Sequence, residues 1–352
     1  MNFNIPHEHR AVYLLGACGI LVIALALVIK KELSYHASSS QTPVVVTKGG
    51  ASSTAPFIPP IASSSHPLAS TTSTTVTKPP VPVPPSPLDK VSADAYIVGN
   101  AATGAIYLSK NPTMVNGLAS ISKLFTALVA DDNMDQSQVI QITPAMLAVY
   151  PNAYGILLGE KFSLNDLIYA MLLQSNDNIA EGIAMAYSSP TTYISAPAGT
   201  APSEAAFIDK MNALSGSLGL TQTHFEDASG LADGNVSNAR DLFSFARYLY
   251  RSQPALLTLS ATYAHSVATT TDHLGHTFIN INPFAGQADY IGGKTGRTDT
   301  AGETMLSIFD YKFKGVDYPI VVIVLHSDIL ERQSDTELLY QEALKLIGKN
   351  ES

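Results

Sequence analysis

The stretch LASISKLFTALVA, from Leu118 to Ala130, places a serine and a lysine three residues apart at the start of an apolar run. In an α-helix the residues i and i+3 share a face, so Ser120 and Lys123 are within reach of each other. Desolvation of that lysine favours the free amine, and a free amine beside a hydroxyl can produce a nucleophile. By itself the S-x-x-K spacing is weak evidence, because a surface lysine at a helix edge gives the same letters.

Two later stretches supply more residues of the kind that this chemistry needs. GGKTG, from Gly292 to Gly296, lies in an apolar segment typical of a strand, where glycines let a ligand approach the backbone closely. LLQSNDNIAEGIA, from Leu172 to Ala184, places Ser175 and its polar neighbours between two apolar helical runs. Residues at such a junction often serve only as helix caps, so this stretch gains weight only beside the other two.

The apolar periodicity predicts strands near both ends of the folded region and helices between them. This arrangement favours an α/β (α+β) domain, with a sheet formed from the chain's two ends, flanking helices and a mostly helical lobe. Ser163 is the expected cap of one helix, and Gly348 is the expected stop of the last helix. The expected strands are 94–100, 104–110, 289–296, 303–309 and 317–326, and the expected helices are 120–130, 163–173, 204–220, 238–251 and 334–348.

The N-terminal quarter of the chain has a different composition. After a short tail, 1–10, residues 11–29 are apolar and uncharged, and at 1.5 Å per residue they span about 28 Å, close to one bilayer core. No small-residue cleavage site follows, so we expect a retained transmembrane anchor. Cys18 lies in a weak match to a lipid-acylation site, but the apolar run continues past it. Residues 30–87 hold 11 of the 21 prolines and predict a disordered tether, leaving 88–352 as the folded domain.

The charge balance, the single cysteine and the histidines limit the partners, disulfides and metal sites that the chain can have. The net charge of −9 argues against nucleic acid as a partner, although a local cationic pocket can still hold a carboxylate. With one cysteine, no intrachain disulfide can form. His265, His273 and His276 do not form a known zinc spacing and are interpreted as part of a polar loop or strand edge. We therefore expect neither a metal nor a cofactor.

S-x-x-K, then an S-x-N-like site, then K-T-G, in this order, resembles the active-site triplet of the penicillin-binding and serine β-lactamase superfamily. The detail resembles the D-alanyl-D-alanine carboxypeptidase family of low-molecular-weight penicillin-binding proteins, and it covers essentially all of Ser92 to the C-terminus. ASISKLFTALVA is similar to that family's ASxTKxMTAxVA, and GGKTGRTDTAGET to its GxKTGxTxxAG. FIDKMNALSGSLGLTQTHFEDASGL, from Phe207 to Leu231, and SNARDLFSFARYL resemble two further family segments.

The resemblance implies that Ser120 attacks the D-Ala–D-Ala carbonyl of a peptidoglycan stem peptide, and that water later releases the acyl group. It implies Lys123 as the base, Ser175 and Lys294 as the proton route to the leaving D-alanine, and the amides of Ser120 and Arg297 as the oxyanion hole. β-Lactams would acylate the same serine. The implied catalytic residues are Ser120, Lys123 and Ser175, and the implied substrate-binding residues are Asn176, Asp177, Asn178, Lys294, Thr295, Gly296, Arg297 and Thr298.

The second motif departs from the family pattern. Without a gap, the asparagine position of S-x-N falls on Asp177, and a slip of one residue would restore an asparagine from Asn176 or Asn178. An Asp177 carboxylate facing the pocket would lie unfavourably beside an anionic substrate. A β-lactamase with a deacylating glutamate is a weaker interpretation, because Glu204 and Glu226 lack an asparagine at the required spacing.

Several functional alternatives remain. The leading one is a D-Ala-D-Ala carboxypeptidase; a DD-endopeptidase that cuts cross-links uses the same chemistry. A non-catalytic module that binds penicillin or the wall would explain a degenerate second motif, and a tethered adhesin would explain only the anchor and the linker. For either enzyme we expect a single-pass protein of the cytoplasmic membrane with its catalytic domain outside the cytoplasm.

Overall fold

The sheet of the domain joins the two ends of the described chain. The computed structural model describes residues 86–151, 155–190 and 203–350, which lie within one compact unit, Pro80–Ser352. Its five-stranded sheet has the order β2-β1-β11-β10-β9, and every neighbouring pair is antiparallel. The strands are β1 (Ala95–Asn100), β2 (Ile106–Lys110), β9 (Tyr290–Thr298), β10 (Gly302–Phe313) and β11 (Val316–Ser327), which confirms the predicted strands to within a few residues.

A tight hairpin fixes the register of the two longest strands. Phe313 of β10 pairs with Val316 of β11, so only Lys314 and Gly315 form the turn. Both have positive φ, 48° and 79°, which is the backbone of a two-residue turn that matches the twist of its strands. In the strand order of the sheet, β11 is central, β10 lies beside it and β9 forms one edge.

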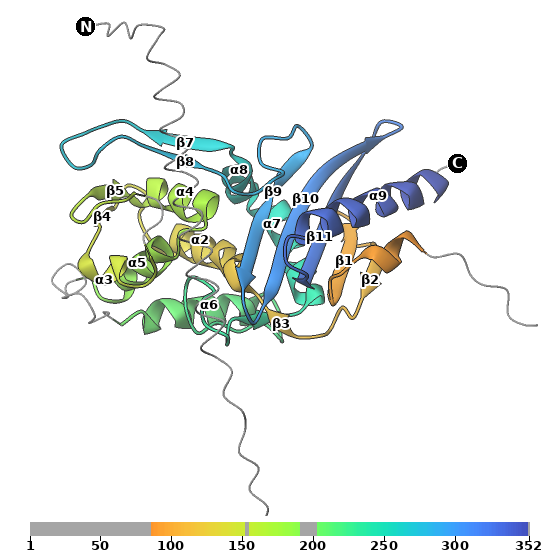
Figure 1. Cartoon of the computed structure of the whole chain (residues 1–352), viewed down its shortest axis with the longest axis horizontal. Coiled ribbons are helices and arrows are strands. Elements are labelled where there is room, and N and C mark those ends of the chain that lie inside the picture. The colour runs from red at the N-terminus through yellow and green to blue at the C-terminus, as the bar shows by residue number, and fades with distance from the viewer. Residues whose placement is uncertain (1–85, 152–154, 191–202, 351–352) are drawn as a thin grey trace, which may run out of the picture. The chain divides into compact units, whose positions relative to one another are not determined.

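The sheet separates two hydrophobic cores because side chains alternate between its faces. Ile97 and Ile323 face a core shared with the helical lobe, whereas Val98 and Val322 face a core shared with the C-terminal helix. That helix, α9 (Arg332–Asn350), lies across the sheet in Figure 1, and the remaining helices gather mainly beyond the β9 edge. The active-site segments meet at this edge.

The helical lobe follows the predicted pattern, with its caps in place. Ser163 caps α4 by accepting a bond from the Asp166 amide at 3.1 Å, as expected, and Asn238 caps α7 through the Asp241 amide at 2.8 Å. The α-helices are α2 (Ser122–Asn133), α3 (Pro144–Leu147), α4 (Leu164–Gln174), α5 (Asp177–Ser188), α6 (Ala205–Ser217), α7 (Ala239–Ser252) and α8 (Pro254–Ala261).

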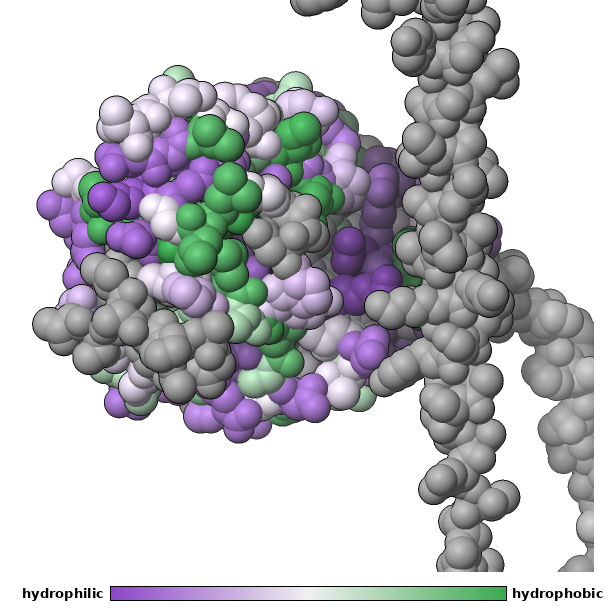
Figure 2. Space-filling view, turned by 60° about the vertical axis from the view of Figure 1, so that its left-hand side comes forward, coloured by the Kyte–Doolittle hydropathy of each residue, from purple (hydrophilic) through white to green (hydrophobic). Residues whose placement is uncertain are grey.

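Short elements connect this lobe to the sheet. The 3-10 turns are η1 (Pro87–Lys90) and η2 (Ala119–Ile121), and the three small antiparallel pairs are β3 (Asn116–Gly117) with β6 (Val236–Ser237), β4 (Val139–Gln141) with β5 (Lys161–Ser163), and β7 (Ala264–Val267) with β8 (His276–Ile279). Figure 2 views the lobe from its outer end and shows hydrophobic residues gathered in a band across a mostly hydrophilic surface.

Two helix boundaries differ from the prediction, and the N-terminal predictions cannot be compared with the structure. Gly348 was expected to stop the last helix, but α9 continues through it to Asn350, since a glycine inside a helix lowers stability without forcing an end. The helix expected at 204–220 ends earlier, because α6 stops at Ser217 and Gly219 follows with φ of 70°. The predicted anchor at 11–29, Cys18 and nearly all of the linker lie outside the described residues; inside them, no helix is both long and apolar enough to cross a membrane.

Candidate active site

Ser120 lies in a constrained turn just before α2. The preceding Ala119 has φ of 48°, a left-handed backbone that an alanine rarely adopts. Its carbonyl accepts a bond from Ser122 Oγ at 2.9 Å. Gly230 packs so closely on the same carbonyl that a Cβ at this position would overlap it. These contacts fix the Ser120 backbone before any substrate binds.

Lys123 is completely buried one turn after Ser120, which excludes the interpretation of a surface lysine. Its Nζ donates to Ser120 Oγ at 2.8 Å, to Asp177 Oδ1 at 2.6 Å and to the Ser229 carbonyl at 2.6 Å. The Ser229 amide in turn donates to Glu181 Oε1 at 2.9 Å. The predicted contact between the Ser120 hydroxyl and the Lys123 amine is therefore present. The same amine also bonds the Asp177 carboxylate.

The S-x-N-like stretch forms the junction between α4 and α5, and Asp177 takes the asparagine position. Ser175 ends α4 with φ of 57°. Asn176 is the cap of α5, with its side chain accepting from the Ile179 amide at 3.2 Å. Asn178 bonds the Tyr150 backbone, at 2.8 Å to the amide and 3.0 Å to the carbonyl. Both neighbouring side chains therefore bond the local backbone, and Asp177 is the one of the three that bonds Lys123.

The Asp177 carboxylate is turned toward Lys123. Its side chain is 15% exposed and forms the 2.6 Å ion pair with the fully buried amine. The concern that Asp177 would present an unbalanced negative charge to an anionic substrate is thus not supported by the geometry, because a positive partner lies in direct contact. The second motif is modified, and its new residue is part of the site.

Lys294 approaches the same centre from the strand side. This β9 residue is 2% exposed, and its Nζ donates to Ser175 Oγ at 2.9 Å and to the Thr295 carbonyl at 2.8 Å. Burial lowers the pKa of Lys294 well below that of a free lysine; the charges of Lys123 and Arg332 add to this, and the charge of Asp177 opposes it.

Glycines allow β9 to lie close to its neighbours. A Cβ on Gly292 would meet the Leu257 carbonyl of α8, and the Gly293 amide donates to Ser260 Oγ at 3.0 Å. A Cβ on Gly296 would lie 2.8 Å from the Ser120 backbone nitrogen. The GGKTG strand thus borders the nucleophile as expected; the oxyanion hole formed by the Ser120 and Arg297 amides stays a prediction.

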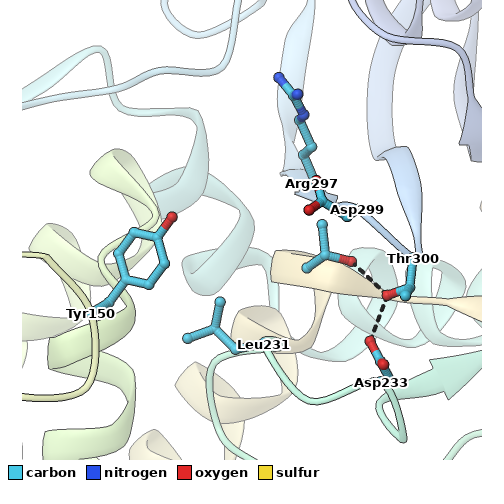
Figure 3. A pocket seen from close by; sticks show the side chains of 7 residues that line it. Tyr150, Leu231, Asp233, Arg297, Asp299 and Thr300 are labelled. Atoms are coloured by element: carbon cyan, nitrogen blue, oxygen red, sulfur yellow. Dashed lines mark hydrogen bonds between the residues drawn. The ribbon is translucent and has the colours of Figure 1, made fainter. Parts of the chain in front are cut away.

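A pocket of about 520 Å³ opens beside the end of β9. Figure 3 shows Tyr150 and Leu231 facing the segment that carries Arg297, Asp299 and Thr300, and Asp233 accepting a bond from Thr300 Oγ1 at 2.5 Å. Thr298 lines the same pocket. Two predicted substrate-binding residues, Arg297 and Thr298, therefore border an open space large enough for more than a single amino acid.

Three residues of the site were missed by sequence reasoning. Arg332, at the start of α9, donates to the Gly296 carbonyl at 3.0 Å, and its Nε lies 3.7 Å from Glu303 Oε2. Ser229 supplies an acceptor for Lys123, and Tyr150 lines the pocket. Arg332 contacts the motifs from far along the chain, so no local spacing could have identified it, whereas Ser229 lies within the family-like segment Phe207–Leu231.

The three histidines lie away from this centre, along the β7–β8 hairpin and its connection. His265 Nε2 lies 2.8 Å from Asp166, His276 Nε2 lies 2.8 Å from Glu160, and His273 Nδ1 lies 2.8 Å from the Leu274 carbonyl. Across 86–151, 155–190 and 203–350, no group of three or more potential ligands is arranged to hold a metal ion.

Comparisons with known proteins show which family the chain resembles. The family model described as D-alanyl-D-alanine carboxypeptidase, peptidase S11, matches residues 78–325. A D-alanyl-D-alanine endopeptidase of Pseudomonas aeruginosa is 29% identical over 249 residues, which are 68% of this chain and 74% of the relative. A D-alanyl-D-alanine carboxypeptidase of a Streptomyces species is 25% identical over 279 residues, 76% of this chain and 89% of the relative.

A solved structure agrees with these relatives. Penicillin-binding protein D2 of Listeria monocytogenes, in its cefotaxime-bound form, has a TM-score of 0.56 and 27% identity, covering 72% of this chain and 98% of that one. The family match spans well over half of the sequence and includes Ser120, Lys123, Ser175 and Lys294. The chain therefore belongs to the S11 family of serine peptidases, the D-alanyl-D-alanine carboxypeptidases.

Proposed function

We propose that the protein is a serine D-Ala-D-Ala carboxypeptidase that removes the terminal D-alanine from peptidoglycan stem peptides through an acyl-enzyme on Ser120. The observation that carries this proposal is the contact of Ser120 Oγ with the buried Lys123 amine at 2.8 Å, together with the Ser175–Lys294 contact at 2.9 Å. A hydroxyl beside buried amines is the arrangement that serine acyl transfer requires.

In the proposed mechanism each group takes part in one step. Ser120 Oγ attacks the carbonyl carbon while its proton passes to a buried amine, and the Ser120 and Arg297 amides stabilise the oxyanion. Ser175 and Lys294 return a proton to the leaving nitrogen. Thr295, Thr298 and Arg297 bind the free carboxylate of the substrate. Water then attacks the acyl-enzyme and releases the shortened peptide; no cofactor or metal enters the sequence.

The first test is the intact mass of the full chain before and after penicillin, with the Ser120→Ala variant measured alongside. We expect one penicilloyl adduct on the wild type and none on the variant, because the β-lactam ring amide is opened by the same nucleophile. Failure of the folded wild-type protein to form the adduct would contradict the proposal. An adduct without release of D-alanine from a stem pentapeptide would favour the non-catalytic binding module.

A DD-endopeptidase is the second candidate, and the pocket favours it. A carboxypeptidase expels one D-alanine, whereas an endopeptidase expels a whole stem peptide and needs room for it. The space of about 520 Å³ beside Arg297 and Thr298 exceeds what one alanine occupies, and the similar Pseudomonas protein is named an endopeptidase. A cross-linked muropeptide dimer and a pentapeptide monomer, given separately to the same preparation, distinguish the two: conversion of dimer to monomers without release of free D-alanine identifies the endopeptidase.

We also propose that the domain is tethered outside the cytoplasmic membrane. The uncharged run 11–29 and the proline-rich segment 30–87 support this, because they fit an anchor and an extended spacer that lets the domain reach the wall. Membrane fractionation of cells expressing the full chain and a chain lacking 1–29 tests it. Equal recovery of both chains in the soluble fraction would contradict the anchor.

A further inference from the structure

The hydrogen bonds of the two active-site lysines differ in number. An ammonium group has three hydrogens to donate, whereas a neutral amine has two hydrogens and one lone pair. Lys123 Nζ has three acceptors, namely Ser120 Oγ, Asp177 Oδ1 and the Ser229 carbonyl. Lys294 Nζ has two acceptors among the described residues, Ser175 Oγ and the Thr295 carbonyl. Since a serine hydroxyl can donate as well as accept, the number of partners does not by itself assign the charges, and the surroundings of each lysine decide them.

The Asp177 carboxylate provides the reason why Lys123 can remain charged. A buried ammonium is tolerated only when it is paired, and Lys123 has no solvent exposure. Asp177 lies 2.6 Å away, the distance of a short charge-assisted hydrogen bond. An asparagine here would supply an oxygen but no negative charge. The residue that departs from the family pattern therefore favours the protonated form of Lys123.

Lys294 has the opposite surroundings. It is buried, no carboxylate of the described residues forms an ion pair with it, and the charges that act on it are Lys123, Arg332 and, at longer range, Asp177. Two of these three charges are positive. Burial and the two cations together lower the pKa of Lys294 well below its usual value.

We propose that Asp177 is a positioning residue that holds Lys123 as an ammonium and leaves Lys294, acting through the Ser175 hydroxyl, as the acceptor of the Ser120 proton. This inference rests on the proposed acyl transfer at Ser120. It assigns the role of base to the strand lysine in this protein, whereas the family resemblance implies the helix lysine.

The steps balance in protons and charge. The Ser120 Oγ–H bond breaks as the Oγ–carbon bond forms; Ser175 receives this proton and passes its own to the Lys294 lone pair. Lys123 keeps its three hydrogens and stabilises the developing charge on Oγ through the 2.8 Å bond. When the carbon–nitrogen bond of the tetrahedral intermediate breaks, Lys294 returns a proton through Ser175 to the leaving nitrogen. Neither Asp177 nor Lys123 changes its protonation state.

A double-mutant cycle on the full chain tests the inference. The measured quantity is the second-order rate of acylation by fluorescent penicillin in the wild type, Asp177→Asn, Lys294→Met and the double variant. Loss of a general base costs about 10²–10⁴-fold, so Lys294→Met alone should lower the rate by roughly 1000-fold. In the Asp177→Asn background, Lys123 can lose its proton and replace Lys294. The same Lys294→Met change should then cost only about tenfold.

Asp177→Glu is the matched control, because it keeps the carboxylate. In that background Lys294→Met should again cost roughly 1000-fold, which would show that the charge of residue 177 and not its substitution produces the coupling. If Lys294→Met has the same effect in all three backgrounds, Lys123 is the base irrespective of Asp177, and the inference is overturned.

The charge of each lysine can also be measured without activity. In the full chain labelled with ¹³C-lysine, the Cε signals of Lys123 and Lys294 are assigned by their loss in the Lys→Met variants. We expect the Lys294 signal at the position of a neutral amine while the Lys123 signal remains that of an ammonium. The reverse order would overturn the inference. If no wild-type protein is acylated by penicillin, the proposed function fails. The Cε signals then still show whether Lys123 is charged and Lys294 neutral.

Discussion

The helical side and the strand side of the active site are held in place by different forces. On the helical side, Lys123 and Asp177 come from two helices and meet through a side-chain ion pair of 2.6 Å. On the strand side, Lys294 and Gly296 belong to β9, whose position is fixed by backbone pairing with β10 and by the absence of side chains at its glycines. One side therefore depends on core packing and paired charges, and the other on close backbone approach.

This difference explains which substitutions each side tolerates. On the helical side, a charged residue can replace a neutral one of the same shape, as Asp177 in an asparagine position illustrates. Such a replacement alters the charge beside Lys123 while the fold persists. On the strand side, a methyl group added at Gly296 would overlap its neighbours around the nucleophile, so the strand or the nucleophile would have to shift. We therefore expect the helical side to tolerate substitutions that alter the reaction more readily than β9 does.

The largest effect is expected from Phe125→Ala on the helical side. Phe125 of α2 is fully buried, and its ring stacks on Phe245 with centroids 3.7 Å apart and contacts Phe225 at 4.7 Å. Removing a buried phenylalanine costs about 3–5 kcal/mol, so the free energy of unfolding in urea should fall by that amount. Phe125→Leu is the control and should cost less. A loss for Phe125→Ala no larger than for Phe125→Leu would show that core packing does not hold this side.

The motifs within single elements could be predicted from the sequence, since their geometry is local. Ser120 in η2 and Lys123 in α2 lie three residues apart and in contact, and GGKTG falls within β9, so local spacing predicted both arrangements. The apolar runs of β10 and β11 predicted strands, and these runs are nearly continuous because side chains on both faces of the sheet enter one of the two cores. Gly348 was misinterpreted because a glycine favours a helix end without requiring one.

The contacts that join distant elements could not be predicted. Asp177 lies 54 residues after Lys123, and Arg332 lies 36 residues after the Gly296 carbonyl that it bonds. The sequence left three candidates for the second motif, Asn176, Asp177 and Asn178. Only the structure shows that the two asparagines bond the local backbone and that Asp177 meets the lysine.

Gly296→Ala examines the strand side directly. An ideal Cβ at this position lies 2.8 Å from the Ser120 nitrogen and 2.5 Å from Thr304 Oγ1, so either the strand or the nucleophile must shift. A misplacement of about 1 Å in a reacting group can cost roughly 100-fold, and we expect a loss of that order in the acylation rate by penicillin.

Gly216→Ala is the matched control, since Gly216 is exposed on α6 and a Cβ there meets nothing within 4 Å. It should leave the acylation rate unchanged and stabilise the helix by up to about 1 kcal/mol. Equal acylation rates in Gly296→Ala and Gly216→Ala would show that close backbone approach does not hold the strand side in place.

The smallest effect is expected from Arg332→Gln, because the charge of this α9 residue acts on Lys294 of β9. Arg332 lowers the pKa of Lys294, so Arg332→Gln should raise that pKa. If neutral Lys294 is the base, its neutral fraction at a given acidic pH then decreases, and the acid limb of the acylation pH profile moves to higher pH. The Arg332 side chain is 22% exposed, and solvent screens its charge, so the rate on the acid limb should fall by less than about tenfold while the alkaline plateau persists. Arg332→Lys retains the charge and should keep the limb in place. A limb that stays fixed in Arg332→Gln would mean that the strand side is electrostatically independent of α9, and that backbone geometry alone distinguishes it from the helical side.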